Sequence, residues 1–310
     1  MTTDISPHIW LNGKLVQQAD AVIPISDRGF RFGDGVFETI RLHNGIPYQW
    51  DLHIARLYSG LKALRISLTS IPSLPKSASN YISLYELLLN EARILISKNG
   101  ADTSDHSLRI AISRGSGSKG FLPIIDDNIP TLIMETSPLP INKKNNVQIH
   151  ISSICRIPTQ CLPTHAKLAQ GLNNTLARLE AKDNLADEAL MLTPDGFIAE
   201  CSAANIFWIK DNILYTPELK TGCLPGTTRS AVMRLFQGEC KEVLMKCDAL
   251  LSADEVFITN TGWKISPVQS IVNYDREWVL YPITNSLQQR LDNDIQHYAV
   301  PYAHSVAAPS

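Results

Sequence analysis

Residues 137–146, SPLPINKKNN, constrain the fold most, because this stretch holds two prolines among polar residues and has no apolar period. Such a composition is typical of a linker. The residues before it form hairpin patterns and then two amphipathic stretches, whereas strands and helices alternate after it. We therefore expect an α+β protein with a small domain at 1–136, a larger domain at 147–310 and a linker at about 137–146.

In the first part, Asn12-Gly13 and Asn44-Gly45 are typical hairpin turns between strand patterns. The apolar period then changes to that of a helix, for which Asp51 is the expected N-cap. The expected strands are 9–25 with its turn, 37–42, 46–48, 107–114 and 130–136, and the expected helices are 51–64 and 81–98.

The second part alternates between the two periods, and its tail from about Tyr298 is expected to be frayed. The expected strands are 147–154, 188–193, 205–209, 242–247 and 255–259, and the expected helices are 168–184 and 226–237.

Composition narrows the class of function. The chain has 310 residues, 44% of them hydrophobic, and a formal net charge of −2. Mixed charges favour neither nucleic acid nor an anionic membrane, and no uncharged apolar run approaches the roughly 18 residues of a membrane span. The six cysteines lack metal-ligand spacing, so we expect reduced thiols in a cytoplasmic protein without an N-terminal leader. A small-molecule partner is favoured, and no metal is expected.

Residues 112–121, ISRGSGSKGF, contain a G-x-G-x-x-G pattern directly after a strand pattern. A dinucleotide site needs a helix immediately after these glycines. The residues that follow, FLPIIDDNIP, have two prolines and no helical period, so nicotinamide or flavin binding is disfavoured. The cations Arg114 and Lys119 need another explanation.

Three segments in a fixed order are more specific: ECSAANIF at 200–207, Leu214-x-Thr216, and LPGTTR at 224–229. Together they resemble the signature of the class IV aminotransferases, the pyridoxal 5'-phosphate enzymes of fold type IV. The resemblance covers nearly the whole chain, from IWLNGKLV to ITNTGWKISPV. Thr227 departs from the signature, which usually has an aliphatic residue there.

The resemblance implies pyridoxal 5'-phosphate as the cofactor and a role for each matching residue. Lys167 matches the lysine that forms an imine with the cofactor, where burial would lower the lysine pKa and favour a nucleophile and proton carrier. Glu200 matches the carboxylate that pairs with the pyridine nitrogen. The first implied phosphate site is the start of a helix at Gly226, Thr227 and Thr228, where backbone N–H groups bind anions. The two further implied phosphate ligands are Arg56 and Thr261.

The resemblance also places the strand and turn RIAISRGSGSKGF on the substrate side of the pocket, in the small domain. Arg109, Arg114 and Lys119 are then candidates for binding substrate carboxylates. Lys119 fits a solvated loop equally well, and for Arg56 an ordinary exposed helix arginine is the alternative.

The family contains transaminases and a lyase, and pocket residues help to separate them. The D-amino-acid enzymes trap a carboxylate with an arginine, a tyrosine and a histidine; Arg114 matches the first, but Phe37 and Ser116 replace the others. Arg109 matches the arginine of the branched-chain enzymes, whereas the positions of their pocket tyrosines hold Phe32, Ser107 and Leu172.

The segments RFGDGVFETI, ISRGSGSKGF and ECSAANIFW are similar to those of aminodeoxychorismate lyases. The favoured function is therefore 4-amino-4-deoxychorismate lyase, which forms 4-aminobenzoate and pyruvate for folate synthesis. The alternative is a branched-chain or D-amino-acid aminotransferase that uses 2-oxoglutarate or pyruvate, for which LPGTTR and the chain length are more typical. A nicotinamide oxidoreductase and a binding protein without catalysis remain as other classes, and the family analogy implies a homodimer.

Overall fold

The computed structural model describes residues 7–71, 80–117, 119–124, 128–139 and 146–302. The chain divides into two compact units. Unit 1 comprises Met1–Leu139, Ala166–Gln170 and Tyr298–Ser310, and unit 2 comprises Pro140–His165 and Gly171–His297. The expected linker thus coincides with the change from unit 1 to unit 2 at Leu139, but two later segments group with unit 1. A single boundary between two domains, as expected from the sequence, does not account for these two segments.

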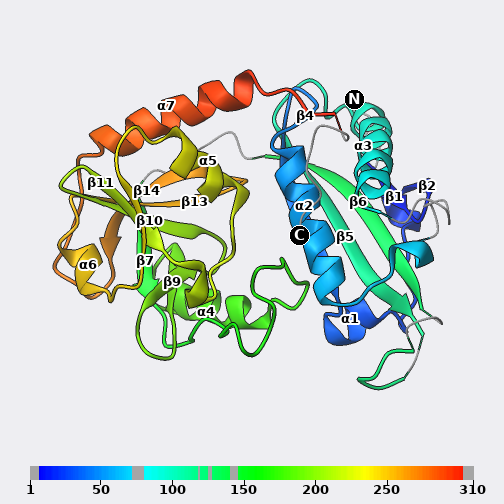
Figure 1. Cartoon of the computed structure of the whole chain (residues 1–310), viewed down its shortest axis with the longest axis horizontal. Helices are drawn as coiled ribbons and strands as arrows, with labels where there is room; N and C mark the ends of the chain where they lie inside the picture. The colour runs from blue at the N-terminus through cyan, green and yellow to red at the C-terminus, as the bar shows by residue number, and fades with distance from the viewer. Residues whose placement is uncertain (1–6, 72–79, 118, 125–127, 140–145, 303–310) are drawn as a thin grey trace. The chain divides into compact units, whose positions relative to one another are not determined.

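Unit 1 is a six-stranded antiparallel sheet with helices, and it can be followed in Figure 1. Its strand order is β2-β1-β6-β5-β3-β4. The strands are β1 (His8–Leu11), β2 (Lys14–Gln17), β3 (Gly35–His43), β4 (Ile46–Pro47), β5 (His106–Ser116) and β6 (Ile129–Pro138), and the helices are η1 (Gln18–Asp20), α1 (Arg28–Phe32), α2 (Trp50–Ala63), η2 (Leu68–Ser70) and α3 (Tyr81–Lys98).

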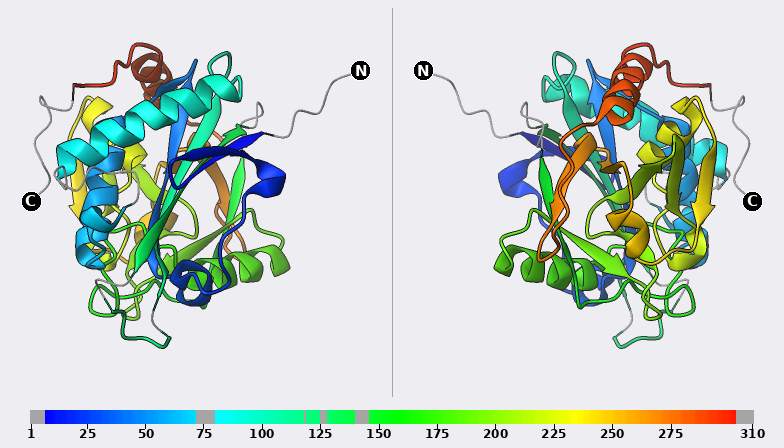
Figure 2. Two further views of the ribbon diagram at one scale, coloured as in Figure 1. Left: turned by 90° about the vertical axis from the view of Figure 1, so that its right-hand side faces the viewer. Right: turned by 90° about the vertical axis from the view of Figure 1, so that its left-hand side faces the viewer.

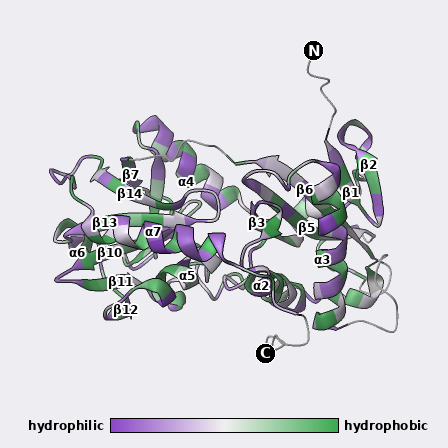
Figure 3. Ribbon diagram, turned by 90° about the horizontal axis from the view of Figure 1, so that it is seen from above, coloured by the Kyte–Doolittle hydropathy of each residue, from purple (hydrophilic) through white to green (hydrophobic). Residues whose placement is uncertain are grey.

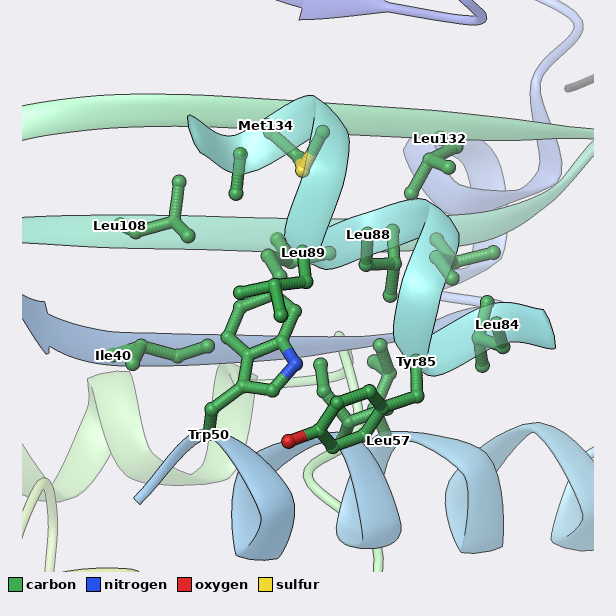
Figure 4. Close-up of a cluster of buried hydrophobic side chains, with 14 of the residues drawn as sticks. Ile40, Trp50, Leu57, Leu84, Tyr85, Leu88, Leu89, Leu108, Leu132 and Met134 are labelled. Carbon is green, nitrogen blue, oxygen red and sulfur yellow. The ribbon is translucent and has the colours of Figure 1, made fainter. Parts of the chain in front are cut away.

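The core of unit 1 lies between this sheet and helices α2 and α3. Trp50 and Leu57 of α2 are buried against Tyr85 and Leu88 of α3, as the close-up in Figure 4 shows. Figure 2 shows α3, in cyan, lying across the strands. Burial of each large apolar side chain contributes about 1.5–3 kcal/mol, so this cluster holds β3 and α2 in fixed positions.

The start of α2 and the C-terminal segment of the chain differ from expectation. Asp51 is not the N-cap, because α2 begins at Trp50 with Gln49 in the left-handed conformation at φ 53°. Asp51 instead accepts a hydrogen bond from the Tyr298 hydroxyl at 2.8 Å. Tyr298 also packs on Tyr48, and the Tyr85 hydroxyl donates to the carbonyl of Pro301. Residues 298–302 are therefore anchored on unit 1 rather than frayed; residues 303–310 lie outside the described residues.

Unit 2 contains a mixed eight-stranded sheet with the order β12-β11-β10-β13-β14-β7-β8-β9. The β7–β8, β7–β14 and β11–β12 pairs are parallel, and the others are antiparallel. The strands are β7 (Val147–Ile151), β8 (Glu188–Leu192), β9 (Ile198–Cys201), β10 (Asn205–Lys210), β11 (Ile213–Pro217), β12 (Cys240–Val243), β13 (Glu255–Asn260) and β14 (Lys264–Ile271), and the helices are α4 (Leu172–Asp183), η4 (Leu219–Thr221), α5 (Thr227–Leu235), α6 (Asp248–Leu251) and α7 (Pro282–Gln296).

Strands β9, β11 and β14 and helix α7 were not expected from the sequence. Helix α7 is mostly polar, as its purple residues in Figure 3 show, and its apolar stripe has only Leu287, Leu291 and Ile295. These three residues recur at every fourth position, so the helical period is present but rests on few residues. The α+β class is confirmed, since each unit combines a sheet with helices.

Within the described residues, none of the helices has the length and apolar character needed to cross a bilayer. The same residues contain no group of three or more histidines, cysteines or acids placed to hold a metal ion.

Candidate active-site residues

Lys167 is held at the edge of β3 by backbone hydrogen bonds. The Phe37 amide donates to the Lys167 carbonyl at 3.0 Å, and the Ala169 amide donates to the Gly35 carbonyl at 2.9 Å. Strand β5 pairs with the other edge of β3. The expected helix at 168–184 therefore starts later, at Leu172, because the residues before it form this short bridge instead. The bridge places Lys167 in unit 1, not in the larger unit as expected.

The ring of Phe37, on the sheet of unit 1, lies close to two cationic side chains. The Lys167 Nζ lies 4.7 Å from the centre of the Phe37 ring, and the guanidinium carbon of Arg109 lies 4.0 Å from it. An aromatic face attracts cations at this range. The Glu135 carboxylate is 3.6 Å from Arg109, and both side chains are partly exposed. The amine of Lys167 and the guanidinium of Arg109 thus share one aromatic neighbour.

Arg56 is joined to a buried carboxylate on the other face of β3. Its Nε and Nη2 donate to the two oxygens of Glu38 at 2.7 and 2.6 Å, and His53 Nδ1 lies 2.7 Å from Glu38 Oε2. Burial raises the pKa of Glu38, but the charge of Arg56 and the hydrogen bonds outweigh burial and lower it to about 2. Burial lowers the pKa of His53, so a neutral His53 donates from Nδ1 to an ionised Glu38.

Arg114 has a structural role that needs no substrate. Its Nε and Nη2 donate to the carboxylate of Asp34 at 2.8 and 3.0 Å, and its Nη groups also donate to the carbonyls of Leu64 and Arg65. Arg28 Nε donates to the same carboxylate at 2.9 Å. Burial raises the pKa of Asp34, but its bonds with Arg114 and Arg28 lower it below the usual range. These contacts account for Arg114 without the expected carboxylate-binding role.

The glycines of the SRGSG loop allow close approach between strands. A Cβ on Gly115 would lie 1.7 Å from the carbonyl oxygen of Ile129, and Gly115 has φ +79°. A Cβ on Gly117 would lie 1.8 Å from Asn128 Oδ1. The register between β5 and β6 shifts here, which is a bulge. The loop carries Lys119 as an exposed side chain.

Glu200 is a buried carboxylate of unit 2, near the end of β9. Arg156 Nε lies 2.9 Å from Glu200 Oε1, while the Leu224 amide and Asn205 Nδ2 donate to Oε2 at 2.9 and 3.3 Å. Three donors thus satisfy the buried Glu200 carboxylate and fix its orientation.

The start of α5 lies next to this carboxylate network. Asn205 Nδ2 also donates to the Leu224 carbonyl at 2.9 Å, and a Cβ on Gly226 would lie 2.1 Å from Asn205 Oδ1. Gly226 is the N-cap and contributes no side chain to the first turn, in which Thr227 and Thr228 are buried. The turn has a helix dipole and backbone donors, which favour an anion.

Thr261 follows β13, in the turn before β14. The preceding Asn260 fixes this turn, because its Oδ1 accepts from the Trp263 amide at 2.7 Å and its Nδ2 donates to the Ala203 carbonyl at 3.1 Å. Strand β13 pairs with β10 through Thr259 and Asn205. Thr261 is thereby positioned within the same unit as Glu200 and the start of α5.

Several residues of these networks were not predicted from the sequence, among them Glu38, His53, Arg156 and Asn205. A signal for Glu38 was present, because the alternation of β3 places this carboxylate among buried residues such as Val36 and Ile40. A charge at a core position of a strand is rare without a partner. Arg156 and Asn205 lie in segments whose partners are distant in the sequence, so no local pattern could identify them.

A cavity in unit 2 borders the start of α5, because Pro225, which precedes Gly226, lines it. It has a volume of about 460 Å³ and is lined by residues 159–165 with Leu219, Cys223 and Pro225. None of the residues expected to bind the cofactor or the substrate lines it. This cavity therefore does not identify the cofactor or substrate site. The candidate site residues are identified by the chemistry of their side chains.

Comparison with known proteins identifies the family. The family model for class IV amino-transferases matches residues 35–271. The chain belongs to the class IV aminotransferase family. It is 34% identical to the aminodeoxychorismate lyase of Bacillus subtilis, over 86% of this chain and 88% of that one. It is 30% identical to the D-alanine aminotransferase of Bacillus licheniformis, over 93% and 96% of the two chains.

A solved class IV aminotransferase confirms the fold type. The T.th. branched-chain amino acid aminotransferase, complexed with N-(5'-phosphopyridoxyl)-L-glutamate, matches this chain with a TM-score of 0.81 and 26% identity. The match covers 96% of this chain and 97% of the other. The protein is thus a class IV aminotransferase-family enzyme of PLP fold type IV, and its cofactor is pyridoxal 5'-phosphate.

Groups of the kinds that this cofactor needs are present in each unit taken by itself. Unit 1 has an amine at Lys167 and a guanidinium at Arg56, and unit 2 has a buried carboxylate at Glu200. The glycine N-cap of α5 adds a helix start at which a Cβ would collide with Asn205. An imine-forming amine, an acid for the ring nitrogen and an anion site are the groups that pyridoxal phosphate requires.

Proposed function

We propose that this enzyme acts on the amino group of a small anionic substrate and is a 4-amino-4-deoxychorismate lyase, which produces 4-aminobenzoate and pyruvate for folate synthesis. The observation that carries the proposal is the pair of cations, Lys167 and Arg109, beside the Phe37 ring. An amine that moves the proton on the carbon next to the substrate's nitrogen, a guanidinium for a carboxylate and an aromatic face for an unsaturated ring suit such a substrate.

The proposed roles of the chain's residues follow from their contacts. Bound pyridoxal phosphate supplies the electron sink for the carbon next to the nitrogen. Lys167 Nζ carries the proton to and from that carbon. Glu200, held by Arg156, keeps its negative charge for the ring nitrogen. Arg56, Thr261 and the turn Gly226, Thr227 and Thr228 bind the phosphate.

The choice of lyase rests on the groups around Phe37. The resemblance to the D-amino-acid enzymes requires Arg114 for the substrate carboxylate, whereas Arg114 is bound to Asp34 and to two backbone carbonyls. The tyrosines of the branched-chain pocket are replaced by Phe32, Ser107 and Leu172. Arg109 remains as the candidate for a substrate carboxylate, with Lys119 as a second, exposed cation.

The alternative is a branched-chain or D-amino-acid aminotransferase with 2-oxoglutarate or pyruvate as acceptor. The D-alanine and branched-chain aminotransferases among its relatives favour this alternative. Both reactions begin with removal of a proton by Lys167, so the early steps do not distinguish them.

A product assay tests the proposal. The purified enzyme is given aminodeoxychorismate, and separately 2-oxoglutarate or pyruvate with L-valine, L-leucine or D-alanine. We expect 4-aminobenzoate and pyruvate from the first mixture, and no product from either mixture with Lys167→Ala. Amino-acid transfer without formation of 4-aminobenzoate would establish the alternative, and a protein that cannot be loaded with pyridoxal phosphate would refute both.

We also propose that the enzyme is cytoplasmic and forms a homodimer. Unit 1 exposes Ile25, Phe30, Phe121 and Leu122, each more than 70% exposed, and a second copy would remove these apolar side chains from water. All six cysteines are free thiols, in keeping with a reducing compartment. Light scattering should give twice the mass of the chain, and Phe121→Ser with Leu122→Ser should lower it.

A further inference from the structure

Glu38, in the middle of β3, is a buried carboxylate that the proposed reaction does not use. It is fully buried, and His53 and Arg56 around it are 2% and 10% exposed in their side chains. His53 and Arg56 lie three residues apart on α2, so both face β3 from one side of the helix. The three side chains form one network, in which Oε2 of Glu38 contacts both partners.

Stability alone is a poor explanation for this network. A buried ion pair is often no more stabilising than apolar side chains of the same volume, because both charges lose their hydration. The pair can, however, restrict motion. An arginine side chain loses much rotamer entropy when it is ordered, and a ligand that meets a preordered guanidinium does not have to order it.

The contact geometry fixes the guanidinium of Arg56. Glu38 holds two nitrogens, Nε and Nη2, with its two oxygens at 2.7 and 2.6 Å. Two parallel hydrogen bonds define the plane of a guanidinium, which a single contact would not. His53, through its own bond at 2.7 Å, prevents the carboxylate from rotating.

We propose that Glu38, braced by His53, is a positioning residue that orients Arg56 for the phosphate group of the cofactor. The inference rests on the proposed role of Arg56 in phosphate binding. Glu38 itself touches neither the phosphate nor the substrate. Its effect is on how well the protein distinguishes a phosphorylated ligand from the same ligand without phosphate.

Equilibrium binding of pyridoxal phosphate and of pyridoxal, followed by absorbance, tests the proposal. Pyridoxal has the same ring and aldehyde but no phosphate. We expect Glu38→Gln to reduce the preference for pyridoxal phosphate by about tenfold, the effect of losing one charge-assisted hydrogen bond, with little change in pyridoxal binding. An equal weakening of both ligands, or an unchanged preference, would overturn the proposal.

Two further variants keep the test decisive. Arg56→Lys keeps the positive charge but removes the two-nitrogen contact, and we expect the same loss of preference. If Glu38→Gln does not fold, an unchanged preference in Arg56→Lys overturns the proposal. Glu255→Gln is the matched control, because Glu255 is also buried but binds the amides of Ile283 and Thr284 in unit 2; its preference should equal that of the unaltered protein.

The outcomes also separate this inference from the proposed function. An unaltered protein that forms product and prefers pyridoxal phosphate, but whose preference survives Glu38→Gln, refutes only the role of Glu38. An unaltered protein that binds neither ligand refutes the proposed function.

Discussion

The Phe37 amide donates a hydrogen bond to the carbonyl of Lys167, and the ammonium of Lys167 lies 4.7 Å from the ring of Phe37. Phe37 of β3 therefore contacts both the backbone and the side chain of the proposed catalytic lysine. The same ring contacts Arg109, so the proposed catalytic lysine and the proposed carboxylate-binding arginine share one aromatic neighbour.

Phe37→Leu should weaken substrate binding more than cofactor binding. The change keeps an apolar side chain but removes the aromatic face, whose contact with a cation contributes about 0.5–2 kcal/mol. We expect KM to rise roughly 2- to 30-fold, as that free energy implies. Steady-state kinetics and the visible absorbance of the loaded enzyme measure the two effects; loss of absorbance with an unchanged KM would contradict the expectation.

Glu200→Gln should fold and load with cofactor, but with a lower kcat. The amide side chain keeps the size of the carboxylate and can still accept from the Leu224 amide, whereas it has no charge for a protonated ring nitrogen. We expect kcat to fall by about 10²-fold or more, comparable with the loss of a charge-stabilising group in other active sites. Glu200→Asp, which keeps the charge, should retain more activity than Glu200→Gln.

Arg114 and Arg109 should respond differently to replacement by glutamine. Arg114→Gln leaves the half-buried Asp34 without its two-nitrogen contact; because Arg28 still pairs with Asp34, the change should cost about 1–3 kcal/mol of unfolding free energy. Arg109→Gln removes a partly exposed cation, so its stability should change by less than about 1 kcal/mol while KM rises. Urea denaturation and kinetics on the same preparations measure both quantities. A large rise in KM for a folded Arg114→Gln would restore its role in substrate binding.

Gly115→Ala should destabilise unit 1 strongly. The added Cβ would lie 1.7 Å from the Ile129 carbonyl oxygen, and the residue has positive φ. Strain of this kind and displacement of β6 should cost about 2–4 kcal/mol. Gly100→Ala is the matched control, because Gly100 also has positive φ, at +64°, but nothing within 4 Å of the added atom. Its cost, measured by the same denaturation, should be only about 1–2 kcal/mol.

Glu180 should make stability depend on pH in the acid range. Burial raises its pKa, but hydrogen bonds from Ser152, the Ser153 amide and His150 outweigh burial and lower the pKa from 4.5 to about 2. A lowered folded-state pKa stabilises the protein above the unfolded value, and that stabilisation is lost as pH falls from about 4.5 towards 2.

Glu180→Gln removes the titrating group, so its unfolding free energy should fall less steeply than that of the unaltered protein over this pH range. Denaturant titrations at several pH values give the slopes. Glu239→Gln, which removes a carboxylate with 59% exposure, should keep the steep dependence. Equal slopes for Glu180→Gln and the unaltered protein would refute the role of Glu180.

The elements that sequence alone predicted are those with a strong local period. Helix α3 has the expected bounds of 81–98, and the turn at Asn12-Gly13 joins β1 and β2 as expected. Lys167, by contrast, was expected where a strand passes into a helix. Its actual position depends on hydrogen bonds with β3, about 130 residues away in the sequence, and such pairing leaves no local pattern.

Contiguous motifs could suggest site residues, whereas partners from distant segments could not be foreseen. Glu200 and the start of α5 lie in short motifs, and the sequence singled them out. The contacts of Arg114 could not be predicted, because its partners, Asp34 and the carbonyls of Leu64 and Arg65, are 80, 50 and 49 residues away. A sequence shows that an arginine is present but not what its donors contact.

The anchoring of Tyr298 on Asp51 has a consequence for biosynthesis. Unit 1 includes residues 166–170 and 298–302, so its contacts are incomplete until nearly all of the chain has left the ribosome. Contacts of such long sequence separation slow folding and prolong the exposure of unpaired strand edges, here the edge of β3 that later pairs with residues 167–169. The nascent N-terminal half is therefore the species most in need of protection by chaperones during synthesis.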